Sequence, residues 1–275
     1  LKQLEHPSLD SPVSKAEISL QQDLTLAAGL SPLLIGQLPR FKIPPVSLAI
    51  STSKVQLTSM KVEPLTAKLT LNKVDVESRQ LSGQLAIPRI RLLMPEQKLP
   101  TAAFTTQFEL SNNELKNRFN LQTSELPITI KGRVKANLAK QRSQLHWSLT
   151  PINLKGLEQH LKAYVQLPPE LTLKRGTFIH KGSGHFDKGN FRATLQNSLK
   201  TADLDWDETE LSGLALNSET RILNDGSLVD KGNIQLKKVT TGIEITEISS
   251  GYTFRHSRKG DLLSLDGPTA QLLQG

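Results

Sequence analysis

Strict alternation of apolar and polar residues is the feature that most constrains how this chain can fold. In ITIKGRVKANL (128–138), one parity carries the large apolar residues, which are Ile128, Ile130, Val134 and Leu138. Every residue between them on the other parity is polar or basic. Successive side chains of a β-strand point to opposite faces, so the stretch predicts a strand with one aliphatic and one polar face. The question that follows is what covers the aliphatic face.

The same alternation recurs along most of the chain and predicts an all-β fold. Short stretches rich in Gly and Asn at 187–190, 224–226 and 258–260 separate alternating runs and predict hairpins, and therefore mostly antiparallel pairing. We expect an elongated, twisted sheet that continues strand after strand. The predicted strands are 15–26, 46–57, 65–71, 81–87, 104–110, 119–123, 128–138, 144–149, 171–180, 190–196, 201–206, 219–223, 233–239, 242–248 and 252–256.

Helix is expected in one or two short segments. Apolar residues at helical spacing occur in 154–165, which the proline pair at 168–169 ends, and a weaker helical pattern occurs in 112–119. The stretches 31–45 and 150–169 have the composition of linkers. They suggest an N-terminal part of the sheet over 1–150 and a helix followed by a C-terminal part over 151–275, with one continuous domain as the alternative.

Composition narrows the function classes. The 275 residues carry a formal net charge of +8, which suits a solvated surface, with anionic membranes or nucleic acid as the other interpretation. Aromatic residues make up only 4% of the chain, which disfavours nucleic-acid binding by base stacking. There is no cysteine, so disulfides and thiolate chemistry are excluded. Because the chain begins at Leu1 and has no run of 18 apolar residues, we expect a piece of a longer or matured protein whose membrane anchor lies elsewhere.

Two clusters of polar residues are candidates for metal or catalytic chemistry. The carboxylates of Asp203, Asp205 and Asp207 do not fit a calcium loop, because Glu208 and Leu214 stand where glycine and glutamate are needed. We expect them on the solvent face of a strand, with Leu204 and Trp206 pointing inward.

The histidines of the segment FIHKGSGHFDKG form the second cluster. His180 and His185 are five residues apart and fall on opposite faces of an unbroken strand, so only a turn at 182–184 could bring them to a shared metal together with Asp187. Motifs for a phosphate loop, a nucleophile elbow or a zinc protease are absent from the sequence. We therefore expect no enzymatic activity, no metal and no cofactor.

The aliphatic stripe has two interpretations. It is either the core of an ordinary sandwich or a groove that holds acyl chains. Burying a CH₂ group gains about 0.8 kcal/mol, so a chain of about 16 carbons gains on the order of 12 kcal/mol. The residues expected to line such a groove are Leu65, Leu69, Leu71, Leu85, Ile87, Phe104, Phe108, Ile128, Ile130, Val134, Leu138, Leu171, Leu173, Leu195, Ile234, Leu236, Ile243 and Ile245.

Two stretches carry a family resemblance: LPPELTLKRGTFIHKGSGHF (167–186) and TTGIEITEISSGYTFRHSRKGDLLSLDGPTAQLL (240–273). They resemble the C-terminal part of YdbH-type proteins, relatives of the AsmA and TamB proteins of Gram-negative envelopes. The resemblance implies a U-shaped β-groove in the periplasm, anchored in the inner membrane, that conducts phospholipid tails toward the outer membrane. An older label of the family concerns dicarboxylate transport, but no arginine cluster that would bind two carboxylates is recognisable in the sequence.

Other functions remain open from the sequence. The sheet could instead be a scaffold or assembly module that recruits a partner by strand addition, such as a small outer-membrane lipoprotein. The hairpin from His180 to Asp187 could bind a small ligand. Phospholipid acyl chains are the expected partners under the leading hypothesis, and nucleic acid is not expected.

Overall fold

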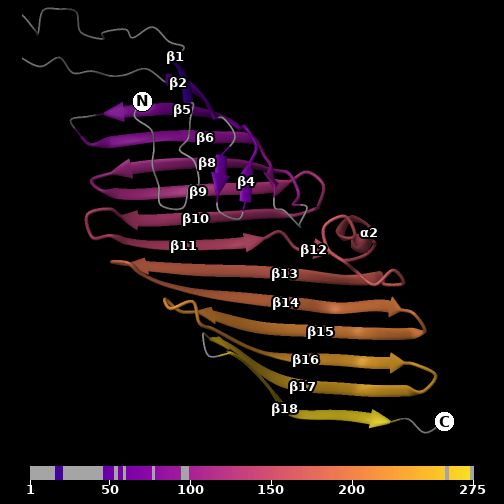
Figure 1. Cartoon of the computed structure of the whole chain (residues 1–275). Helices are drawn as coiled ribbons and strands as arrows, with labels where there is room; N and C mark the ends of the chain where they lie inside the picture. The colour runs from indigo at the N-terminus through magenta and orange to yellow at the C-terminus, as the bar shows by residue number, and fades with distance from the viewer. Residues whose placement is uncertain are drawn as a thin grey trace, which may run out of the picture. The chain divides into compact units, whose positions relative to one another are not determined.

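A computed structural model of the chain describes residues 16–20, 46–52, 55–57, 60–75, 78–93, 99–257 and 260–272 (Figure 1). The described part consists of strands and one short helix, α2 (Leu157–Leu161), which confirms the all-β prediction. The strands are β1 (Ala16–Leu20), β2 (Val46–Thr52), β3 (Val55–Leu57), β4 (Met60–Val62), β5 (Thr66–Asp75), β6 (Gln80–Ile90), β7 (Leu92–Leu93), β8 (Ala102–Ser111), β9 (Glu114–Thr123), β10 (Thr129–Asn137), β11 (Arg142–Leu149), β12 (Ile152–Asn153), β13 (Thr172–Asp187), β14 (Asn190–Trp206), β15 (Thr209–Ile222), β16 (Leu228–Thr240), β17 (Glu244–Ser257) and β18 (Gly260–Leu272).

Most of the strands belong to one large antiparallel sheet that is not closed into a barrel. Its order is β1-β2-β5-β6-β8-β9-β10-β11-β13-β14-β15-β16-β17-β18, with β12 paired to β13. Neighbours in sequence are thus almost always neighbours in the sheet, as the short predicted hairpins require. A separate three-stranded sheet has the order β3-β4-β7.

The chain divides into two compact units. The first comprises residues 1–125 and 132–140, and the second comprises residues 126–131 and 141–275.

The predicted hairpin turns are confirmed where the structure describes them. Asp187 pairs with Asn190 across a turn at Lys188 and Gly189, and a turn at 224–226 joins β15 to β16. Residues 258–259 lie outside the described residues, but Ser257 pairs with Gly260 on either side of them.

The strands of the second unit are longer than the sequence pattern indicates. β13 runs through the segment 182–184 without a turn, and β14 joins two predicted strands into one of 17 residues. The predicted strands 242–248 and 252–256 are likewise parts of β17. In the middle of these strands, polar residues occupy positions whose side chains lie on the apolar face. They interrupt the alternation in the sequence although the strand continues.

A transverse line of irregular positions, called the crease below, crosses these long strands. Residues with positive φ occur at Gly176 (138°) in β13, Thr201 (47°) in β14, Gly213 (69°) in β15 and Glu247 (51°) in β17. Pairing between neighbouring strands is irregular at these points. A bulge inserts one extra residue into a strand, so residues of opposite parity on its two sides can share a face.

Burial is shallow in the described part of each unit. The buried apolar residues are few, three of them are alanine, and none of the large side chains in the described residues is fully buried. Within each unit, the substantial contacts between described elements are those of paired strands, apart from α2 packing on β13. The apolar side chains on one face of these strands are therefore only partly buried in the described part of each unit.

The helix predictions had mixed outcomes. α2 occupies part of the predicted segment 154–165. The helix prediction for 112–119 is wrong, because Asn112 and Asn113 form a tight turn with positive φ and β9 starts at Glu114. Leu115, Phe119 and Leu121 share one parity and are separated by polar residues, a period of two that suits a strand of the sheet.

Candidate functional site: the apolar face and its polar belt

In the first unit, register places the predicted groove residues of three strands on one face. Leu69 of β5 pairs with Leu85 of β6, and Ile87 pairs with Phe104 of β8. Leu71 and Phe108 both pair with Gly83 from opposite sides. All of these large side chains are half-buried, and Leu65 immediately precedes β5 on the same parity.

Close packing of rings against glycine shapes this face. A Cβ at Gly83 would lie 2.9 Å from Cζ of the Phe108 ring, so the absent side chain makes room for the tip of that ring. Phe104 stacks on Phe119 with ring centroids 6.2 Å apart. Buried Thr106 accepts a 2.6 Å hydrogen bond from Asn117, which satisfies the polar group within this face.

The opening segment, 128–138, forms β10 with the predicted alternation. Ile130 and Val134 are half-buried, while Lys131, Arg133 and Lys135 between and beside them are exposed. Ile128 immediately precedes β10. β10 ends at Asn137, one residue before Leu138, which was predicted to belong to the strand. The Leu138 side chain is 51% exposed.

The groove residues predicted in the second unit lie on both sides of the crease. Leu195 of β14 lies between the crease and the β13–β14 hairpin turn. Ile234 of β16 pairs with Leu216 of β15, in a row that lies closer to the crease than Leu195 does. Leu236 follows on the same parity and pairs with Ile248.

Beyond the crease, one apolar row crosses five strands. Leu173 pairs with Leu204, which pairs with Leu211, and the row continues through Val239 to Ile245. Leu171 immediately precedes β13. The strand prediction for Ile243 is wrong: the chain bends at Gly242 (φ 83°), β17 begins at Glu244, and Ile243 is 58% exposed.

A belt of polar side chains crosses the apolar face of the second unit, and this belt was missed at the sequence level. Register gives the central row, in which His180 pairs with Asn197, Asn197 with Ser218, Ser218 with Gly232, and Gly232 with Tyr252. Apolar rows flank it on both sides. We call it the polar belt; its members are Trp147, His180, Asn197, Ser218, Thr220, Asp230 and Tyr252.

The belt is internally hydrogen-bonded. Trp147 donates through Nε1 to Nε2 of His180 (3.0 Å), and His180 Nδ1 is 2.7 Å from Oδ1 of Asn197. Asn197 donates through Nδ2 to Ser218 Oγ (3.2 Å). Ser218 in turn makes a hydrogen bond with Tyr252. Satisfied polar networks of this kind are tolerated on an apolar face, where an unpaired group would be costly.

The chain of hydrogen bonds ends on a carboxylate. Tyr252 donates through its hydroxyl to Oδ2 of Asp230 (2.7 Å), and buried Thr220 donates to Oδ1 of the same group (2.7 Å). Burial raises the pKa of Tyr252 above its ordinary value, and the hydrogen bond to Asp230 raises it further, while the bond with Ser218 acts in the opposite direction.

Glycines in the belt make room for its rings. A Cβ at Gly182 would lie 2.0 Å from a ring carbon of Trp147, and one at Gly232 would lie 2.8 Å from the ring of Tyr252. The two rings therefore lie against bare backbone. This explains why glycines occur inside two long strands, where they weaken the strand unless a side chain uses the space.

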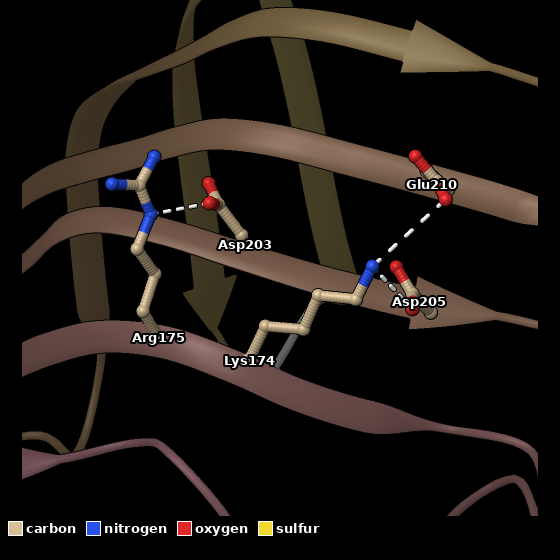
Figure 2. A network of polar contacts seen from close by, with 5 residues as sticks. All are labelled: Lys174, Arg175, Asp203, Asp205 and Glu210. Carbon is tan, nitrogen blue, oxygen red and sulfur yellow. Dashed lines mark hydrogen bonds and ion pairs between the residues drawn. The ribbon is translucent and has the colours of Figure 1, made fainter.

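A cluster of charged residues lies at the crease (Figure 2). Arg175 bonds to Asp203, and Lys174 makes ion pairs with Asp205 (2.6 Å) and Glu210 (3.9 Å). Leu204 lies between Asp203 and Asp205 in β14, and Leu211 follows Glu210 in β15, so the carboxylates and the apolar row occupy opposite faces. The bulge between Leu173 and Arg175 brings Arg175 opposite Asp203. Burial acts to raise the pKa of Asp203, but hydrogen bonds from Arg175 and the Gly213 amide outweigh it and lower the pKa.

The acidic segment 203–210 is only partly as expected. Asp203, Asp205 and Glu210 lie on the polar face, as predicted. Asp207 (φ 53°) and Glu208, however, form the β14–β15 turn. Trp206 sits beside that turn and is 52% exposed, so the prediction that it points inward is wrong.

The histidine cluster does not converge. His180 pairs with Asn197 in the polar belt, while His185 pairs with Arg192 on the other parity of the unbroken strand β13. The Asp187 carboxylate instead forms an ion pair with Arg142 (2.9 Å), and the hydrogen bond from Arg142 lowers the pKa of Asp187. Among the described residues, no group of three or more His, Asp or Glu side chains could hold a metal ion.

No protein-family model, curated protein or solved structure matches the chain. Within the described ranges, no helix is long and apolar enough to cross a membrane.

Proposed function

We propose that this chain is a non-catalytic segment of a lipid-transfer protein of the Gram-negative envelope, in which the apolar face of the sheet carries phospholipid acyl chains between the inner and outer membranes. The periplasmic location and an anchor outside this sequence follow from the resemblance to YdbH-type proteins. One observation supports the proposal most: among the described residues, the aligned apolar side chains of consecutive strands are only partly buried, and no large side chain is fully buried.

The chemistry of that face suits hydrocarbon. Its residues are mainly Leu, Ile, Val and Phe, which attract acyl chains through the non-directional hydrophobic effect and dispersion. A tail of about 16 carbons leaving water gains on the order of 12 kcal/mol, of which even a partial share suffices for binding. Because these attractions are non-directional, a tail can slide along such a face.

The test is lipid analysis of the protein after gentle extraction. Native mass spectrometry should detect phospholipid bound to the chain, and vesicle-to-vesicle transfer of a labelled phospholipid should be faster with the protein than without it. Lipid-free protein that also fails to take up lipid from vesicles would overturn the proposal.

A second candidate function is an envelope scaffold that recruits a partner by strand addition. The observation that favours it is β18, a strand of 13 residues that pairs only with β17 among the described strands. Leu262, Leu263 and Leu265 on it are 58–61% exposed. Such an open edge offers backbone hydrogen bonds to an incoming strand, for example from a small outer-membrane lipoprotein. Lipid-free protein that captures a partner through β18 would favour this alternative.

A further inference from the structure

Asp230 is an unusual residue for the face on which it lies. It pairs with Thr220 on one side and with Phe254 on the other, and Phe254 pairs with Leu263. The next row along the sheet toward the hairpins carries Ala193, Ile222 and Leu228. A carboxylate is therefore placed among apolar side chains, where an ionised group is costly unless it is compensated.

The hydrogen-bond partners of Asp230 are neutral. Its two oxygens accept from the hydroxyls of Thr220 and Tyr252, at 2.7 Å each. In the part of the chain that the structure describes, no Lys, Arg or His forms an ion pair with it. The charge is held in place by these hydroxyls but is not neutralised.

Basic side chains of the same strands lie on the opposite face. Arg221, Lys231 and Arg255 alternate with Thr220, Asp230 and Phe254 along β15, β16 and β17, and they surround one hollow on the polar face. On the apolar face, His256 lies in the row next to that of Asp230, opposite Leu228, and its Nδ1 is 2.5 Å from Oδ1 of Asp261. Each carboxylate oxygen of Asp230 retains a free lone pair for a further donor.

We propose that Asp230 binds the ammonium group of an amine-bearing phospholipid, whose acyl chains lie on the apolar rows beside the belt. The proposal rests on the proposed function and adds a head-group preference to it. The ammonium supplies the charge and N–H donors that the carboxylate lacks, and the ring of Tyr252 offers a face for the same cation. An anionic head group would be repelled by Asp230.

The experiment compares phosphatidylethanolamine with phosphatidylglycerol, which has no amine. The protein is incubated with vesicles of equal parts of the two lipids and re-isolated, and the bound lipids are quantified by mass spectrometry. The parent should be enriched in phosphatidylethanolamine. Asp230→Asn should lower the ratio of the two bound lipids about threefold, the size expected of a half-exposed ion pair, with little change in total lipid.

The matched control is Glu219→Gln, which also removes one negative charge. Glu219 precedes Thr220 in β15, lies on the polar face and forms an ion pair with Arg221 (2.8 Å). Glu219→Gln should keep the parental ratio. Asp230→Glu, which keeps the charge, should also keep most of the preference, so that a folding defect in Asp230→Asn cannot imitate the result. Excess phosphoethanolamine without acyl chains should not displace the bound lipid.

The outcomes separate the two proposals. If the parent binds neither lipid, the proposed function itself fails. If the parent binds lipid but Asp230→Asn keeps the parental ratio, or Glu219→Gln changes it equally, only the head-group assignment is overturned. Displacement of the lipid by phosphoethanolamine would overturn the assignment to a lipid and make the belt a site for a small amine.

Discussion

The indole nitrogen of Trp147 donates a hydrogen bond to Nε2 of His180 on the neighbouring strand, at 3.0 Å. An indole N–H can only donate, so Nε2 must be the unprotonated nitrogen of the ring. The proton then resides on Nδ1, which is 2.7 Å from Oδ1 of Asn197. Trp147 and Asn197 together fix one neutral tautomer of His180.

This tautomer is directly observable. Two-dimensional ¹H–¹⁵N correlation spectra at alkaline pH should show His180 with the proton on Nδ1, whereas exposed His146 should show the usual mixture. Trp147→Phe removes the donor and should shift His180 toward that mixture. A parent spectrum with the proton on Nε2 would contradict the arrangement of the belt.

Gly182→Ala should destabilise the protein by about 1–3 kcal/mol, because the new methyl group collides with the Trp147 ring. Gly184→Ala is the control, since its nearest neighbour would be 3.3 Å away and its cost should be smaller. Urea unfolding followed by circular dichroism measures both. In a Trp147→Ala background the Gly182→Ala penalty should largely vanish; an equal penalty in both backgrounds would mean that the ring is not the cause.

The phenol of Tyr252 should ionise above the ordinary pKa of tyrosine. The sequence has two tyrosines, so absorbance titration of a Tyr164→Phe variant reports Tyr252 alone. Burial is the larger cause and the hydrogen bond to Asp230 is the next, so Asp230→Asn should lower the pKa without restoring the ordinary value. Because the folded-state pKa is raised, the associated stability is present below the unfolded pKa and is lost as pH rises through the folded one. A normal Tyr252 titration in the parent would show that its hydroxyl is not held as described.

Asp203→Asn should cost about 1 kcal/mol at pH 7, a value discounted because Arg175 is largely exposed. The folded-state pKa of Asp203 is lowered, so its contribution is present above the unfolded pKa and is lost as pH falls through the folded value. The difference between variant and parent should therefore shrink below about pH 4. Unfolding curves at pH 7 and pH 3 measure it, with Glu208→Gln in the adjacent turn as the control, which should differ little from the parent at either pH.

Leu85→Asp should reduce the phospholipid bound to the protein about tenfold, since a charge among acyl chains is costly. Gln84→Asp places the same charge on the polar face one residue away and should leave the bound lipid unchanged. Both should remain folded, because Leu85 is only half-buried. Equal lipid binding by the two variants would count against an acyl-binding face.

The sequence pattern was sufficient for the class of fold because alternation is a local signal. It predicted one apolar face through Leu69, Leu85 and Phe104, and the register of β5, β6 and β8 places all three on one face. It also separated the faces of His180 and His185 correctly.

The polar belt could not be recognised in the same way. Its members come from β11 and β13–β17, and only pairing between strands shows that Asn197, Ser218 and Tyr252 share a row. Each of these three polar residues occupies a position where the alternation calls for an apolar one. In a single sequence, such an interruption resembles the end of a strand. Ile243 and Trp206 were misplaced because the start of β17 and the β14–β15 turn depend on positive φ at Gly242 and Asp207.

The extra residue at Thr201 has a consequence for how this sequence tolerates change. Odd-numbered residues such as Leu195 and Leu199 lie on the apolar face before it, and even-numbered ones such as Ala202 and Leu204 do so after it. Loss of that single residue would exchange the two faces at the end of β14 and place Asp203 on the apolar face and Leu204 on the polar face, although every other residue of the strand would be unchanged.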